Sequence, residues 1–127
     1  MPADRANLLT HDPDRYADEQ WWRTQRPELV MGPASWRWVE RAYASWQMLE
    51  TPGALERIGV PVLIVSTSSD KLVSHPANLR AAARLPKGEI IALGDEAHHE
   101  VLRESDGVRS AIMAEIADFL DRAAPRG

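Results

Sequence analysis

The sequence contains no cysteine among its 127 residues. This absence excludes a disulfide scaffold, a thiolate zinc site and a cysteine nucleophile, so any chemistry falls to serine, histidine, carboxylate or tyrosine side chains or to a cofactor. Basic residues are fewer than acidic ones, 15 against 19, which gives a net charge of -4. An acidic chain of this kind presents no basic face, and we expect no binding to nucleic acid.

Long apolar runs are missing as well. The longest, residues 60–65, is interrupted by Pro61 and is far shorter than the ~20 residues of a membrane span. Residues 1–5 lack the charged and then apolar succession of a secretory signal. The sequence therefore predicts a cytoplasmic protein without integral membrane association, and its 44% hydrophobic and 27% charged content is typical of one soluble domain.

Two helices are predicted within residues 1–53. Asp12 before Pro13 is typical of a helix start, because the carboxylate accepts free amide hydrogens and proline is tolerated at the first helical position. That helix is expected over residues 13–26, and a second one opens after residues 32–33 and ends near residues 51–53. The second helix has apolar residues at helical spacing: Val39, Ala42, Tyr43 and Trp46.

Residues 54–127 show a different pattern. A β-branched run predicts a strand over residues 62–66, and a second apolar strand is expected at residues 89–93, with a short helix over residues 74–85 between them. Strand, helix and strand of this length predict a parallel pair. A last helix, capped by Ser105 or Asp106, carries an apolar stripe made of Val108, Ala111, Ile112, Ile116, Phe119 and Leu120. Because parallel sheets are usually larger and covered on both faces, we expect a partial α/β fold with an open sheet edge.

Asp70 and His99 follow the two predicted strands. Functional groups of parallel sheets lie beyond the carboxyl ends of the strands, so these two side chains are expected to meet. A carboxylate can fix the tautomer of an imidazole and stabilise its protonated form, although loops also hold both residue types as simple turn or cap residues.

Metal ligation is a further interpretation of the crowded acidic and histidine residues at positions 95–100. Adjacent histidines on an extended loop point apart, whereas helical metal pairs are spaced four residues apart. We therefore expect no metal and no cofactor. Asp95 and Glu96 are interpreted as solvated loop charges, and His11 and His75 as turn and cap residues.

With these elements in this order, the chain resembles the C-terminal half of an α/β hydrolase of the lysophospholipase and monoacylglycerol lipase type, related to the serine aminopeptidase group. The matching segments are residues 7–16 (NLLTHDPDRY), 32–39 (GPASWRWV), 58–65 (IGVPVLIV), 70–73 (DKLV), 97–102 (AHHEVL) and the last helix. The resemblance implies a helical cap over residues 1–53 and the C-terminal part of the hydrolase core over residues 54–127. It also implies that Asp70 is the orienting acid and His99 the general base of a catalytic triad.

One family motif is absent from these 127 residues, namely the G-x-S-x-G turn that carries the nucleophilic serine. The resemblance thus implies a C-terminal fragment of a serine ester hydrolase, inactive by itself, that acts on an acyl ester or lysophospholipid-like molecule. The family's cap covers the active site, which makes Trp22, Trp36 and Trp38 the predicted substrate-binding residues. Tyr43 and Trp46 are expected to pack the two predicted helices together.

A second interpretation is a non-catalytic remnant or interaction module. It would associate through its open sheet edge, either as a homodimer or with a complementing N-terminal half. A G-x-S-x-G segment encoded directly upstream favours the hydrolase, and an unrelated upstream segment favours the interaction module.

Overall fold

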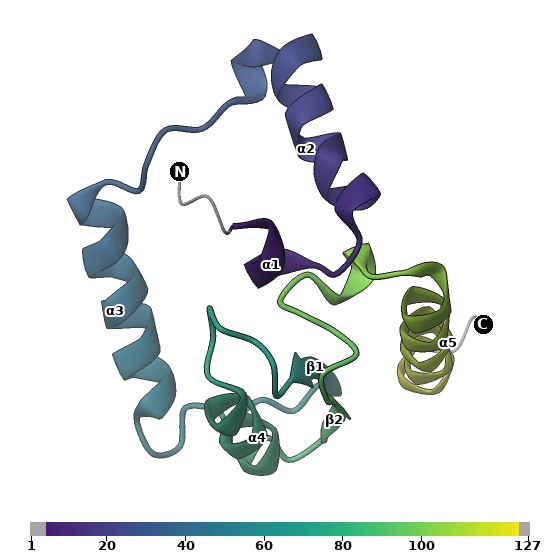
Figure 1. Cartoon of the computed structure of the whole chain (residues 1–127). Helices are drawn as coiled ribbons and strands as arrows, with labels where there is room; N and C mark the ends of the chain where they lie inside the picture. Colours follow the sequence, from purple (N-terminus) through teal and green to yellow (C-terminus); the bar gives the residue numbers. More distant parts are fainter. Residues whose placement is uncertain (1–4, 125–127) are drawn as a thin grey trace.

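The computed structural model describes residues 5–124 and has a mixed α/β architecture. Along the chain the elements are α1 (Ala6–Leu9), α2 (Pro13–Gln25), the 3-10 turn η1 (Pro27–Leu29), α3 (Trp36–Glu50), β1 (Val62–Thr67), α4 (His75–Arg84), β2 (Gly88–Leu93), the 3-10 turn η2 (Val101–Arg103) and α5 (Asp106–Ala123) (Figure 1). The predicted helices and strands are confirmed to within a few residues. The three short elements α1, η1 and η2 were not predicted.

Helices α2 and α3 each begin after a residue whose side chain caps the helix. The Asp12 carboxylate accepts hydrogen bonds from the backbone N–H groups of Asp14 and Arg15, at 3.1 and 3.0 Å. Ser35 caps α3 by accepting the N–H of Trp38 at 3.2 Å. These short-range contacts explain why the starts of α2 and α3 follow from the sequence.

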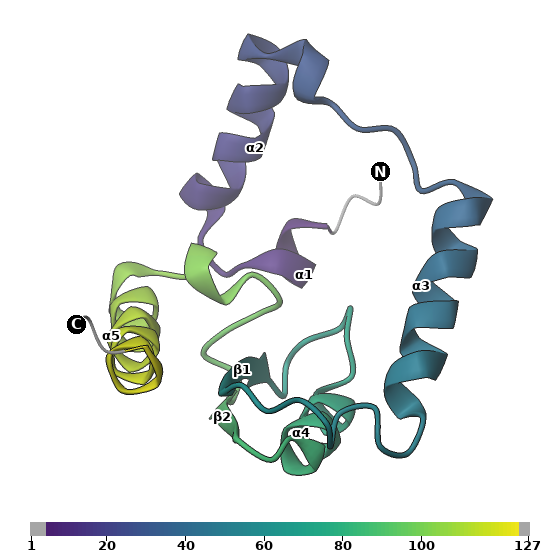
Figure 2. The ribbon, with the colours of Figure 1, turned by 180° about the vertical axis from the view of Figure 1, so that it is seen from behind.

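The sheet has two parallel strands, in register from Val62 opposite Gly88 to Thr67 opposite Leu93. Helix α4 packs on the strands, and α5 lies on the other side of them in both views (Figures 1 and 2). Glycine is required at position 88, where the connection from α4 enters β2, because an added Cβ would lie 2.4 Å from the carbonyl oxygen of Ala82. The sheet therefore holds the loops after β1 and β2 next to each other.

Helices α2 and α3 lie far apart in both views (Figures 1 and 2). The prediction that Tyr43 and Trp46 pack these helices together is therefore wrong, and the two side chains are 64% and 53% exposed. The physical reason is that residues 30–35 have no regular structure and lead the chain away from α2. Helix α3 is instead held at its C-terminal end, where Arg84 of α4 donates to the carbonyl of Leu49 at 2.8 Å.

Apolar surface remains uncovered in the described part of the chain, where no third strand joins the sheet. On α5, Ile112 and Phe119 are buried but Leu120 is 53% exposed. Trp36 of α3 is 89% exposed. Among the helices of residues 5–124, none has the length and apolar content that a bilayer crossing requires.

Candidate active site

Asp70 and His99 are in contact, as the sequence predicts. The Nδ1 atom of His99 lies 2.8 Å from Oδ2 of Asp70. Asp70 lies in the loop after β1 and His99 in the loop after β2, and the parallel pairing of the strands places these loops side by side. The Asp70 side chain is 6% exposed and the His99 side chain 34%. A buried carboxylate is thus hydrogen-bonded to a ring that solvent can reach.

The second oxygen of Asp70 is bound by its own loop. Oδ1 accepts hydrogen bonds from the backbone N–H groups of Leu72 and Val73, at 2.8 and 3.0 Å. Burial alone would raise the pKa of Asp70, but the hydrogen bonds from His99, Val73 and Leu72 outweigh it and hold the pKa below its ordinary value of 3.8. Asp70 is thus an ionised acceptor for the His99 ring.

The hydrogen bond to Asp70 assigns a tautomer to His99. An ionised carboxylate only accepts, so Nδ1 of His99 carries the proton when the ring is neutral, and Nε2 has a free lone pair. Nε2 makes no hydrogen bond to any residue in the range 5–124. This arrangement can take a proton from a hydroxyl group and return it later, which is general acid–base chemistry.

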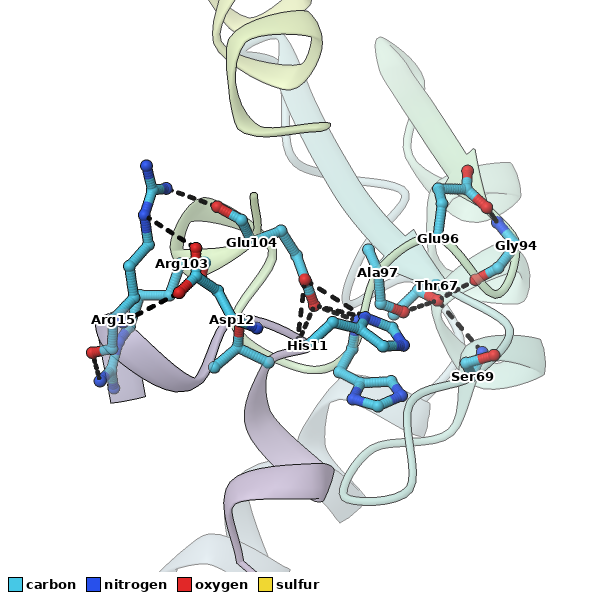
Figure 3. Close-up of polar contacts among 12 residues, drawn as sticks. His11, Asp12, Arg15, Thr67, Ser69, Gly94, Glu96, Ala97, Arg103 and Glu104 are labelled. Atoms are coloured by element: carbon cyan, nitrogen blue, oxygen red, sulfur yellow. Dashed lines mark hydrogen bonds and ion pairs between the residues drawn. The ribbon is translucent and has the colours of Figure 1, made fainter. Parts of the chain in front are cut away.

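His98 lies in a different environment from its neighbour. Its ring stacks on His11 with a centroid separation of 3.6 Å, and its Nδ1 atom is buried without a hydrogen-bond partner among the described residues. Its backbone N–H donates to the Glu104 carboxylate at 2.7 Å. The same carboxylate accepts the backbone N–H of His11 (Figure 3). The structure therefore separates the two adjacent histidines, and His99 is the one that meets Asp70.

One group of side chains has the composition of a metal site. Ligand atoms of His11, His98 and Glu104 lie within 4.8 Å of one another. The Glu104 carboxylate already accepts the backbone N–H groups of both histidines, at 3.1 and 2.7 Å, and is therefore satisfied without an ion. We therefore assign no metal to this group. The sequence did not suggest it, because His11 and Glu104 are 93 positions apart.

The three predicted substrate-binding tryptophans lie in different surroundings. Trp22 borders an open cavity of about 1090 Å³, whose apolar wall also includes Leu29 and Met31. Trp36 and Trp38 lie on α3 and are not among the residues lining that cavity. The structure thus places Trp22 beside a space that can hold an apolar group, although all three side chains are exposed, Trp22 the least of them.

The chain is similar to several curated proteins. It is 29% identical over 123 residues to lysophospholipase L2 of Escherichia coli (strain K12). The match covers 91% of this chain and 35% of that protein. It is 28% identical over 99 residues to "Probable lysophospholipase L2" of Haemophilus influenzae, covering 76% of this chain and 30% of that protein. It is also 37% identical over 68 residues to "Putative carbamate hydrolase RutD" of Agrobacterium fabrum, covering 54% of this chain and 26% of that protein.

These similarities confirm the resemblance to α/β hydrolases of the lysophospholipase type. The chain spans about a third of the length of the curated relatives it matches first. No protein-family model matches the chain. No solved structure matches it either.

Proposed function

We propose that this chain supplies the acid and the base of a serine ester hydrolase of the lysophospholipase type. The observation that carries the proposal is the 2.8 Å contact between Asp70 Oδ2 and His99 Nδ1, which leaves Nε2 of a partly exposed ring free to accept a proton. The similarity to lysophospholipase L2 supports the same assignment. The nucleophilic serine comes from a segment outside these 127 residues, since no G-x-S-x-G motif occurs in them.

In the proposed reaction His99 acts first as a base. Its Nε2 removes the proton of the serine hydroxyl while the serine oxygen attacks the ester carbonyl, and the proton then passes to the leaving alcohol. Water releases the acyl group from the serine by the same steps. Asp70 keeps Nδ1 protonated and stabilises the imidazolium that forms in each step. This scheme uses no metal or cofactor.

The proposed substrate is an acyl ester or a lysophospholipid-like molecule. Residues 1–53 act as the cap and residues 54–127 as the C-terminal part of the core. The apolar wall beside Trp22 supports this substrate class, because aromatic and aliphatic side chains bind acyl chains. Trp36 and Trp38 are proposed to contact substrate once a complementing N-terminal half covers α3. The cytoplasmic location stays a prediction.

A chimera tests the proposal. The segment of E. coli lysophospholipase L2 that matches this chain is replaced by the chain, and hydrolysis of a lysophospholipid is measured. We expect Asp70→Asn and His99→Gln each to lower kcat by about 10⁴. His98→Gln is the matched control, because this ring does not touch Asp70, and it should retain most activity.

The outcome also separates the hydrolase from the interaction module. A folded chimera whose hydrolysis does not depend on Asp70 and His99 would show that the pair has no catalytic role. The non-catalytic interpretation would then stand, in which the open sheet edge associates with another chain.

A further inference from the structure

Two buried polar side chains lie beside the acid–base pair and are not part of it. Residues 97–99 form an irregular loop, and each of them is nonetheless held by another segment. Figure 3 shows the contact of Thr67 with Ala97. His99 is held by Asp70, and the two residues before it are held by Thr67 and Glu104. Thr67 and Glu104 are each 1% exposed and are the largest fully buried side chains among the described residues.

Thr67 joins the loops of the acid and the base. It is the last residue of β1, and its Oγ1 lies 2.6 Å from the carbonyl oxygen of Gly94 and 2.7 Å from that of Ala97. The same oxygen accepts the backbone N–H of Ser69 at 3.1 Å. One hydroxyl thus contacts the residue before Asp70 on one side and the loop that carries His99 on the other.

Glu104 holds the loop of the base from the opposite direction. Its Oε1 accepts the backbone N–H of His98 at 2.7 Å, and its Oε2 accepts the backbone N–H of His11 at 3.1 Å. Nδ1 of His11 lies 3.2 Å from both oxygens. A carboxylate so deeply buried is tolerated only where N–H groups point at it, so its position fixes the positions of those groups.

We propose that Thr67 and Glu104 are positioning residues that set the His99 ring against the Asp70 carboxylate. This inference rests on the proposed function of the pair. With Ala97 held through its carbonyl and His98 through its N–H, the backbone next to His99 cannot shift without breaking a buried hydrogen bond. A displacement of about 1 Å is enough to impair such a pair.

The test uses the complete 127-residue chain and the Asp70 carboxyl group, whose titration is followed by ¹³C NMR. Because the hydrogen bond from His99 lowers the pKa of Asp70, loss of the contact raises it. We expect Thr67→Val and Glu104→Gln to move the titration midpoint upward, toward that of the His99→Gln chain. Thr67→Ser keeps the hydroxyl and should restore the midpoint.

The direction in which Glu104→Gln shifts the pKa of Asp70 distinguishes positioning of His99 from a direct effect of the lost charge. Removing a nearby negative charge by itself lowers the pKa of a carboxyl group, whereas loss of the His99 hydrogen bond raises it. A rise in the Asp70 midpoint therefore supports positioning, and a fall or no change overturns it.

Matched controls remove the same groups elsewhere. Thr24→Val deletes a hydroxyl that donates to the Gln20 carbonyl on α2, and Glu89→Gln neutralises an exposed carboxylate paired with Arg122. Both should leave the Asp70 midpoint unchanged. If Thr67→Val and Glu104→Gln lower only the urea midpoint of unfolding, their role is structural and the inference fails. This readout needs no hydrolysis, so it can fail while the chimera remains active, and the converse also holds.

Discussion

The backbone N–H of Glu100 donates to the carbonyl oxygen of Leu9 at 2.8 Å. The residue after His99 is therefore tied to the end of α1, far away in the sequence. Thr10 adds a second link, because its buried hydroxyl donates to the carbonyl of Arg103 at 2.7 Å. The loop of the base thus depends on residues 9–10 as well as on the sheet.

Acid should weaken the fold partly through Asp70. Its pKa is lower in the folded chain than the ordinary value of 3.8 that applies to the unfolded chain, so its ionised form stabilises the fold above that value. This stabilisation is lost as the pH falls from about 4 through the lower folded-state pKa. Urea unfolding between pH 5 and pH 2 should show a smaller loss of stability for Asp70→Asn than for the parent chain. If the free energy of unfolding falls equally with pH in the two chains, the pKa of Asp70 is not lowered in the folded chain.

Gly88 should not tolerate a side chain. A Cβ there would lie 2.4 Å from the Ala82 carbonyl oxygen and 2.8 Å from Cβ of Leu85. Gly88→Ala is expected to lower the free energy of unfolding by about 1–3 kcal/mol, as overpacking does. Gly59→Ala is the control, because a Cβ at Gly59 meets nothing within 4 Å. Equal unfolding midpoints for the two variants would contradict the close approach of α4 to β2.

Sequence signals predicted the parts of this molecule that depend on neighbours in the chain. The Asp12 cap and the β-branched run of β1 are of this kind, and the contact between Asp70 and His99 follows once the strands are parallel. The bridge from Glu104 to His11 could not be predicted, because it joins residues 93 positions apart and no periodicity links them.

The separation of α2 and α3 was not predictable for a related reason. The apolar spacing that includes Trp46 indicates which face of a helix is apolar, but it does not indicate what that face packs against. In the described structure this face lies largely in solvent.

The purified chain alone should not hydrolyse short p-nitrophenyl esters. An acid and a base cannot turn over an ester by this mechanism without a nucleophile for the base to activate, and the 127 residues contain no G-x-S-x-G motif. Release of p-nitrophenol is the measurement. Robust turnover that a serine-directed inhibitor abolishes would show that a serine of this chain serves as nucleophile.

The chain should associate with itself at micromolar concentration. Its described sheet has only two strands, and large side chains such as Trp36 are almost fully exposed. Open strand edges and contiguous apolar surface favour pairing with another chain. Sedimentation velocity over a range of concentrations should show species larger than one chain. A single species with the mass of one chain and sharp cooperative unfolding would count against this expectation.

The proposed function requires that Asp70 hold His99 in the tautomer that can accept a proton at Nε2. ¹⁵N NMR of the His99 side chain, recorded on the complete chain at a pH where the ring is neutral, tests it most directly. We expect a protonated Nδ1 and an unprotonated Nε2, with a shift toward the other tautomer in Asp70→Asn. A neutral ring protonated at Nε2, or a tautomer ratio that Asp70→Asn does not change, would contradict it.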